Sequence, residues 1–117
     1  MNADEFVWVL NAVVKDAAVE DTISILKSPP GKKPSKELVD LSDFYNNQTD
    51  ENKDIINKII NRVADYSLFG VLCVLDGVRA IEDDGDKGEL ILTYQKNNTP
   101  SIVLNEHKNL HDIYNSN

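Results

Sequence analysis

The stretch 49–77 decides the fold, and it reads TDENKDIINKIINRVADYSLFGVLCVLDG. It is polar at its start and almost wholly apolar at its end, with no charged residue between positions 68 and 75. Apolar side chains recur at steps of three and four, which predicts one helix over 49–76. Thr49 suits an N-cap, and Gly77 suits a stop because glycine adopts the left-handed C-cap conformation at little steric cost. The segment 68–75 is apolar on every face and needs cover on every face, so we expect a long central buried helix whose C-terminal half lies in the core.

Helices are also predicted before this stretch. Residues 1–27 carry an apolar stripe whose register changes near Glu20, which indicates one N-terminal helix or a kinked helix pair. The prolines of the segment 28–31 end that helix. Residues 34–46 form the second predicted helix, and its short polar connection to Thr49 predicts an αα-hairpin with the central helix.

After Gly77 the period of the pattern changes from helical to alternating. Alternation over 78–81, 90–95 and 102–104 predicts a three-stranded antiparallel meander within 78–105, with a turn at 97–100. Residues 106–114 hold enough apolar side chains for one docked C-terminal helical turn. The predicted fold class is therefore α+β, in a single domain over 1–117.

Composition limits the classes of partner. The chain has 117 residues and a formal net charge of −8, which argues against binding nucleic acid through its phosphates. The apolar run 68–75 is too short for a membrane span, which needs about 20 residues. The single cysteine, Cys73, fits a reducing compartment, and the acidic start of the chain is unlike a signal segment. We therefore expect a cytoplasmic protein whose partner is another protein, either a basic one steered by charge or a second copy.

The densest group of acids lies within 82–89, and it allows two interpretations. Several carboxylates in one loop suit calcium, but the EF-hand spacing fails because Gly88 stands at the fifth position counted from Asp84. The favoured interpretation is a hairpin connection kept soluble by its charge. If the protein binds a basic partner, the candidate residues in this connection are Glu82, Asp83, Asp84 and Asp86.

The two histidines, His107 and His111, stand four residues apart beside Asp112. On a helix both rings would face one side, as in many zinc sites, although zinc needs at least a third ligand. These three residues are the metal candidates. The favoured interpretation is one surface histidine and one that hydrogen-bonds the end of the domain, and His111 is also a candidate for binding.

Asp76 and Arg79 flank the exit from the central helix. They are candidates for binding a ligand there, or for a charge pair that closes the junction. Four lysines near 27–36 make a local positive patch, interpreted as an anion site or a solvated loop. No phosphate-cradling loop, dinucleotide fingerprint or Gly-x-Ser-x-Gly elbow is present in the sequence, and we expect no cofactor.

Three segments resemble those of a family of small bacterial proteins of uncharacterised function: SPPGKKP (28–34), FGVLCVLDGVRAIED (69–83) and LHDIYN (110–115). None of the three is a catalytic motif. The resemblance implies a bacterial cytoplasmic domain and brings no activity or cofactor.

The leading hypothesis is a non-enzymatic acidic module that binds another protein, as an immunity or antitoxin protein would. The alternative is a small enzyme or metal-binding protein that uses His107, His111 and Asp112 near Asp76 and Arg79. A self-associating subunit is the third hypothesis, suggested by the apolar residues of the first and central helices.

Overall fold

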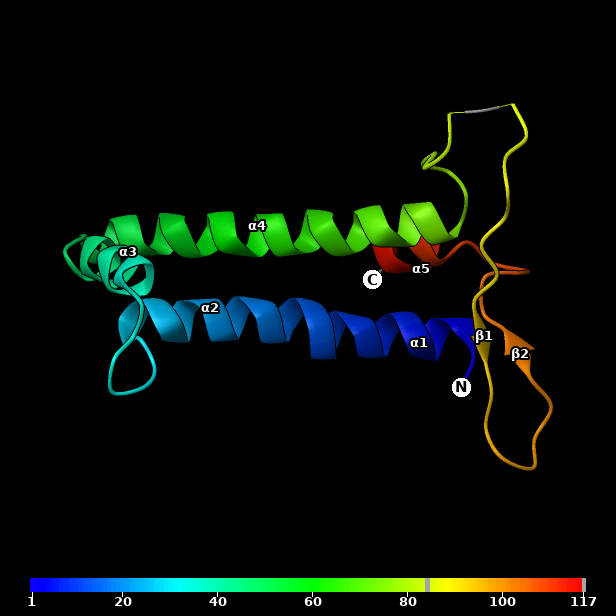
Figure 1. Cartoon of the computed structure of the whole chain (residues 1–117), viewed down its shortest axis with the longest axis horizontal. Coiled ribbons are helices and arrows are strands. Elements are labelled where there is room, and N and C mark those ends of the chain that lie inside the picture. Colours follow the sequence, from blue (N-terminus) through cyan, green and yellow to red (C-terminus); the bar gives the residue numbers. More distant parts are fainter. Residues whose placement is uncertain (84, 117) are drawn as a thin grey trace. The chain divides into compact units, whose positions relative to one another are not determined.

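The computed structural model of the protein describes residues 1–83 and 85–116, and most of these residues are helical. The elements follow in the order α1 (Ala3–Leu10), the π-helix η1 (Asn11–Asp16), α2 (Ala17–Lys27), α3 (Lys36–Asn46), α4 (Asp50–Leu75), β1 (Thr93–Tyr94), β2 (Ile102–Val103) and α5 (Leu110–Asn115) (Figure 1). Internal contacts divide the chain into two compact units. The first unit is Met1–Val14 with Tyr66–Asn117, and the second is Lys15–Asp65.

The predicted α+β fold with a three-stranded meander is wrong. Among the described residues, the sheet is one antiparallel pair in which Thr93 faces Val103 and Tyr94 faces Ile102. The first expected strand, 78–81, which the structure describes in full, does not form, because two of its backbone N–H groups donate to the end of α4. The backbone N–H groups of Val78 and Arg79 both donate to the carbonyl of Cys73, at 3.0 and 3.3 Å. Those two groups therefore complete a helix terminus and are not available to a sheet.

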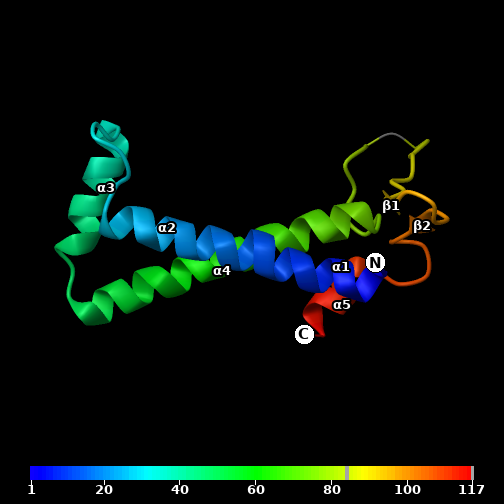
Figure 2. The same cartoon turned by 90° about the horizontal axis from the view of Figure 1, so that it is seen from below.

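The core of the first unit forms where α1, the end of α4 and α5 meet. Its buried members are Val7, Leu68, Leu72, Leu110, Ile113 and Tyr114. α5 contacts α1 directly, and Figure 2 shows the two helices side by side. The predicted C-terminal turn is thus a short helix whose apolar side chains complete this core.

In the second unit, polar contacts join α3 to both α4 and α2. The buried Tyr45 donates its hydroxyl hydrogen to Oδ1 of Asn57 in α4, at 3.0 Å. The Asn46 side-chain amide donates to the carbonyls of Leu26 and Lys27 at 3.3 and 3.1 Å. These are carbonyls at the C-terminus of α2, where the helix offers no partner of its own.

The central helix exists and its buried residues lie in its C-terminal half, as expected, but the expected cover on every face of 68–75 is wrong because Val71 is 57% exposed. Thr49 caps α4 as predicted, since its hydroxyl oxygen accepts the N–H of Asn52 at 3.1 Å. Burial is confined to the C-terminal third, at Leu68, Gly70, Leu72 and Cys73. Within the second unit, one face of α4 exposes a row of apolar side chains, Ile55, Ile59 and Val63, which are 50%, 57% and 59% exposed. The period identified an apolar face, but it did not determine whether another element covers that face.

The register change expected near Glu20 occurs earlier, in the π-helical turn η1. A π-helical turn inserts extra residues into the helical repeat, so the apolar stripe before it and the one after it need not share a face. Within residues 1–83 and 85–116, no helix combines the length and apolar character that crossing a membrane requires.

Candidate functional site

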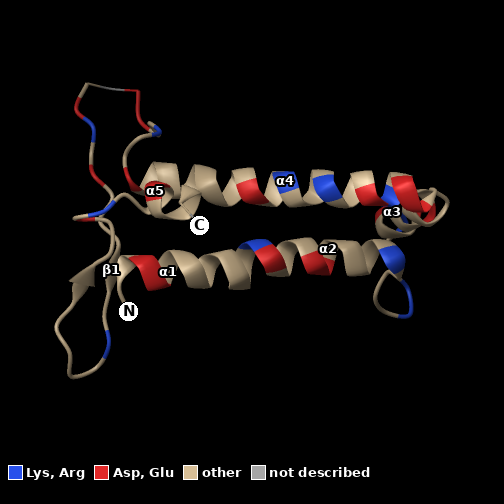
Figure 3. Ribbon diagram, turned by 180° about the vertical axis from the view of Figure 1, so that it is seen from behind, with Lys and Arg blue, Asp and Glu red and all other residues tan. Residues whose placement is uncertain are grey.

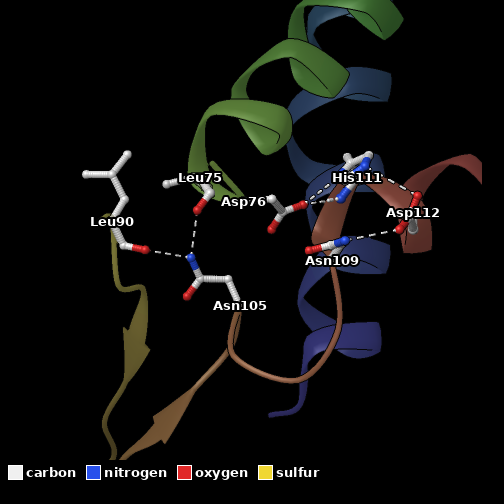
Figure 4. Close-up of polar contacts among 7 residues, drawn as sticks. All are labelled: Leu75, Asp76, Leu90, Asn105, Asn109, His111 and Asp112. Atoms are coloured by element: carbon white, nitrogen blue, oxygen red, sulfur yellow. Dashed lines mark hydrogen bonds and ion pairs between the residues drawn. The ribbon is translucent and has the colours of Figure 1, made fainter. Parts of the chain in front are cut away.

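A buried aspartate and a histidine meet at the C-terminal end of α4. Oδ2 of Asp76 accepts the backbone N–H of His111 at 2.8 Å and lies 2.6 Å from its ring Nδ1 (Figure 4). The Asp76 side chain is 0% exposed and that of His111 is 15% exposed. The structure thus brings together two residues that the sequence had suggested for separate reasons.

Local structure on each side fixes this pair. Asp76 follows the last residue of α4, and Gly77 takes the left-handed conformation there, with φ of +77°. On the other side, the wholly buried Leu110 anchors the first turn of α5 in the core and so positions His111. The ring of Phe69 packs edge-on against the His111 ring, with centroids 6.0 Å apart.

The electrostatics of Asp76 oppose its position. A carboxylate at the C-terminus of a helix faces the negative end of the helix dipole, and burial removes it from water. Its second oxygen, Oδ1, is buried without a hydrogen-bond partner among the described residues. In Figure 4 this oxygen points away from His111, toward the side of the picture where Asn105 lies. Such a costly arrangement is typical of sites that serve function as well as folding.

Both ring nitrogens of His111 face carboxylates. Nδ1 contacts Asp76, and Nε2 lies 3.3 Å from Oδ1 of Asp112. A histidine that acts as a general base needs a free ring nitrogen directed at the reacting group. In this arrangement His111 orients two acids and offers neither nitrogen to a nucleophile.

Asn105 joins the end of α4 to the chain that leads into β1. Its side-chain amide donates to the carbonyls of Leu75 at 2.8 Å and Leu90 at 2.9 Å (Figure 4). Its Oδ1 accepts the N–H of Leu92 at 3.0 Å. No pattern in the sequence indicated this role. Asparagine is common in connections, and these three partners are distant in the chain.

A cavity of about 270 Å³ opens beside this junction, within the first unit. Its charged and amide-bearing lining residues are Asp76, Arg79, Glu82, Lys87, Glu89 and Asn105. Pockets for drug-sized ligands usually have about 300–1,000 Å³. This cavity is therefore of the size that takes a small group or a single side chain.

The acidic candidates lie on the exposed connection that follows α4, where the ribbon of Figure 3 is coloured red at the acidic residues. Glu82, Asp83 and Asp86 are exposed. Glu82 accepts the backbone N–H of Gly88 at 3.3 Å and so closes part of the connection on itself. Asp84 lies outside the described residues.

The metal candidates do not converge. The side chain of His107 is 87% exposed and pairs with the neighbouring Glu106 at 3.3 Å, away from the Asp76–His111 pair. Across residues 1–83 and 85–116, no group of three or more His, Cys, Asp or Glu side chains is arranged to hold a metal ion. Of these candidates, His111 contacts the buried Asp76, and Asp112 contacts His111.

Arg79 does not pair with Asp76 in the described contacts but folds back along α4. A Cβ atom built on Gly70 would lie 2.6 Å from Nη1 of Arg79, so the guanidinium occupies the space above that glycine. In the lysine-rich segment, Lys36 pairs with Asp40 at 2.7 Å across one helical turn. That contact agrees with the solvated interpretation of the segment.

Comparison of the chain with protein-family models, with curated proteins and with solved structures finds no match.

Proposed function

We propose that the protein is a cytoplasmic, non-enzymatic module that binds a basic partner protein. The observation that carries the proposal is the composition of the exposed connection between α4 and β1, which we call the acidic connection (78–83 and 85–92). It combines exposed acids with exposed apolar side chains in one segment. The acids are Glu82, Asp83, Asp86 and Glu89, and the apolar residues include Val78, Ile81 and Ile91.

This combination matches what a protein interface needs. Apolar side chains give the central contacts that exclude water, and charges around them steer the partner and set its orientation. Ile81 is 64% exposed and lies directly beside Glu82 in the chain. With a net charge of −8, the protein as a whole also attracts a basic partner before the two come into contact.

The occupied ring nitrogens of His111 support a binding role over a catalytic one. The contact of Nδ1 with Asp76 links the end of α4 to α5, whereas the contact of Nε2 with Asp112 lies within α5. The first contact fixes the end of α4, from which the acidic connection starts.

Photocrosslinking tests the proposal. A photoreactive amino acid is placed at Ile81 and, as the matched control, at Phe44, which is 62% exposed on α3. In extract of the source organism we expect Ile81 to give a basic crosslinked protein that Phe44 does not give. The yield should fall as salt rises from about 0.1 M to about 1 M, where the Debye length shrinks from about 10 to about 3 Å. The same adducts at both positions, a yield that salt leaves unchanged, or no adduct at Ile81 would contradict the proposal.

Self-association is the second candidate, and the exposed row Ile55, Ile59 and Val63 favours it. Exposed apolar patches larger than usual mark interaction surfaces. Light scattering during gel filtration measures the mass over a range of concentrations. A dimer that Ile59→Lys dissociates would support this role, and a monomer at every concentration would exclude it.

A further inference from the structure

We propose that the cavity at the C-terminal end of α4 receives a cationic side chain, arginine or lysine, of the partner protein. The inference rests on the proposed function and names the chemical group by which that partner is recognised.

Negative charge dominates the cavity. Asp76, Glu82 and Glu89 contribute three carboxylates to the lining. The carbonyl end of α4 adds the negative pole of a 26-residue helix dipole. Two cationic residues, Arg79 and Lys87, line the cavity. The guanidinium of Arg79 lies above Gly70, so among the described contacts only Lys87 can direct its charge into the cavity. The lining is therefore short of positive charge.

Asp76 is the second, independent indication. Oδ2 is held by His111, whereas Oδ1 is buried and has no partner among the described residues. Figure 4 shows Oδ1 on the side of Asn105, which also lines the cavity. A cation in the cavity would supply the opposite charge that this oxygen lacks, over a short path of low dielectric constant.

The surroundings suit a side chain of a protein. The cavity of about 270 Å³ takes one long side chain, and Ile81 and Leu90 of the acidic connection also line it. Both are exposed, at 64% and 42%, and can contact the apolar stem of an arginine or lysine.

The probe is Nα-acetyl-arginine amide, and its control is Nα-acetyl-citrulline amide, which has the same shape without the charge. Titration is followed by NMR on the intact protein at constant ionic strength. We expect the arginine compound to shift the backbone signals of Gly88 and Leu90 and the side-chain amide of Asn105. The citrulline compound should leave them in place.

Charge-neutralising variants locate the effect. Glu82→Gln keeps an oxygen that can accept the Gly88 N–H, and Glu89→Gln tests the other exposed acid of the lining. Each should weaken arginine-amide binding about fivefold, the value of one exposed ion pair of about 1 kcal/mol. Asp83→Asn and Asp86→Asn change the net charge equally outside the lining and should alter binding less than about twofold.

Equal shifts from the two compounds, equal effects from all four variants, or no shift of the cavity signals would overturn the inference. Its failure is distinguishable from failure of the proposed function. If Ile81 still crosslinks a basic partner while the arginine compound does not bind, the docking surface stands without the cavity. If the arginine compound binds while no partner crosslinks, the cavity stands without the docking surface.

Discussion

One oxygen of Asp76, Oδ2, contacts two groups of His111, its backbone N–H and its ring Nδ1, although His111 lies 35 positions further along the chain. The backbone N–H lies 2.8 Å away and the ring Nδ1 2.6 Å away. The pair joins the end of α4 to the first turn of α5 at the edge of the core.

Replacing His111 with alanine should destabilise the fold. The substitution leaves the buried Asp76 side chain with only a backbone donor, and removing one partner of a buried hydrogen bond costs about 1–3 kcal/mol. Because the backbone bond survives, we expect a loss of about 2 kcal/mol in the free energy of unfolding measured with urea. In an Asp76→Asn background His111→Ala should cost at least about 1 kcal/mol less, as contacting residues are not additive. Equal costs in both backgrounds would contradict direct pairing.

Asn105→Ala should loosen the entry into β1. The substitution removes two donors and one acceptor and leaves the carbonyls of Leu75 and Leu90 without this partner. We expect a loss of about 1 kcal/mol, the net value of a typical hydrogen bond, because these contacts are part-buried or exposed, and faster hydrogen exchange at the Leu92 amide. Asn109→Ala is the control, because its side chain makes an exposed 3.3 Å contact with Asp112. An equal loss of unfolding free energy from the two substitutions would show that Asn105 does not specifically connect the end of α4 to β1.

The two ends of α4 should respond differently to the loss of an apolar side chain. Leu72 is fully buried, so Leu72→Ala should cost about 2–5 kcal/mol. Ile59 is 57% exposed, so Ile59→Ala should change the free energy of unfolding by less than about 1 kcal/mol. Urea denaturation measures both. A loss at Ile59 as large as that at Leu72 would mean that the row is covered, for example by a second copy.

Periodicity and capping chemistry predicted the helices because both are local. The cap at Thr49, the left-handed Gly77 and the turn around Asn98, with φ of +65°, all depend on residues near each of them in sequence. The strand predicted at 78–81 failed for a physical reason. Four alternating residues do not distinguish a strand from a capped helix end, and the carbonyl of Cys73 accepts the two N–H groups concerned.

The candidate site was partly predictable. Asp76 and His111 each stood out, the first at a helix terminus and the second beside another histidine, but only the packing of Leu110 brings them together. Asn105 could not be selected, since its three partners are far from it in sequence. The exposure of Ile59 could not be predicted either, because the helical period defines an apolar face but does not determine whether another element covers it.

Gly70 lies within α4, where glycine costs about 1 kcal/mol relative to alanine. A Cβ there would meet Nη1 of Arg79 at 2.6 Å, but the guanidinium ends a flexible side chain and can move aside. We therefore expect Gly70→Ala to raise the free energy of unfolding by up to about 1 kcal/mol while displacing Arg79.

In an Arg79→Ala background the gain from Gly70→Ala should be larger, because no side chain has to move. Urea denaturation of the four proteins gives the cycle, and the Nε signal of Arg79 in NMR spectra reports its displacement. A loss above about 1 kcal/mol in both backgrounds would contradict this account. It would mean that the helix backbone, and not the arginine above it, requires glycine at position 70.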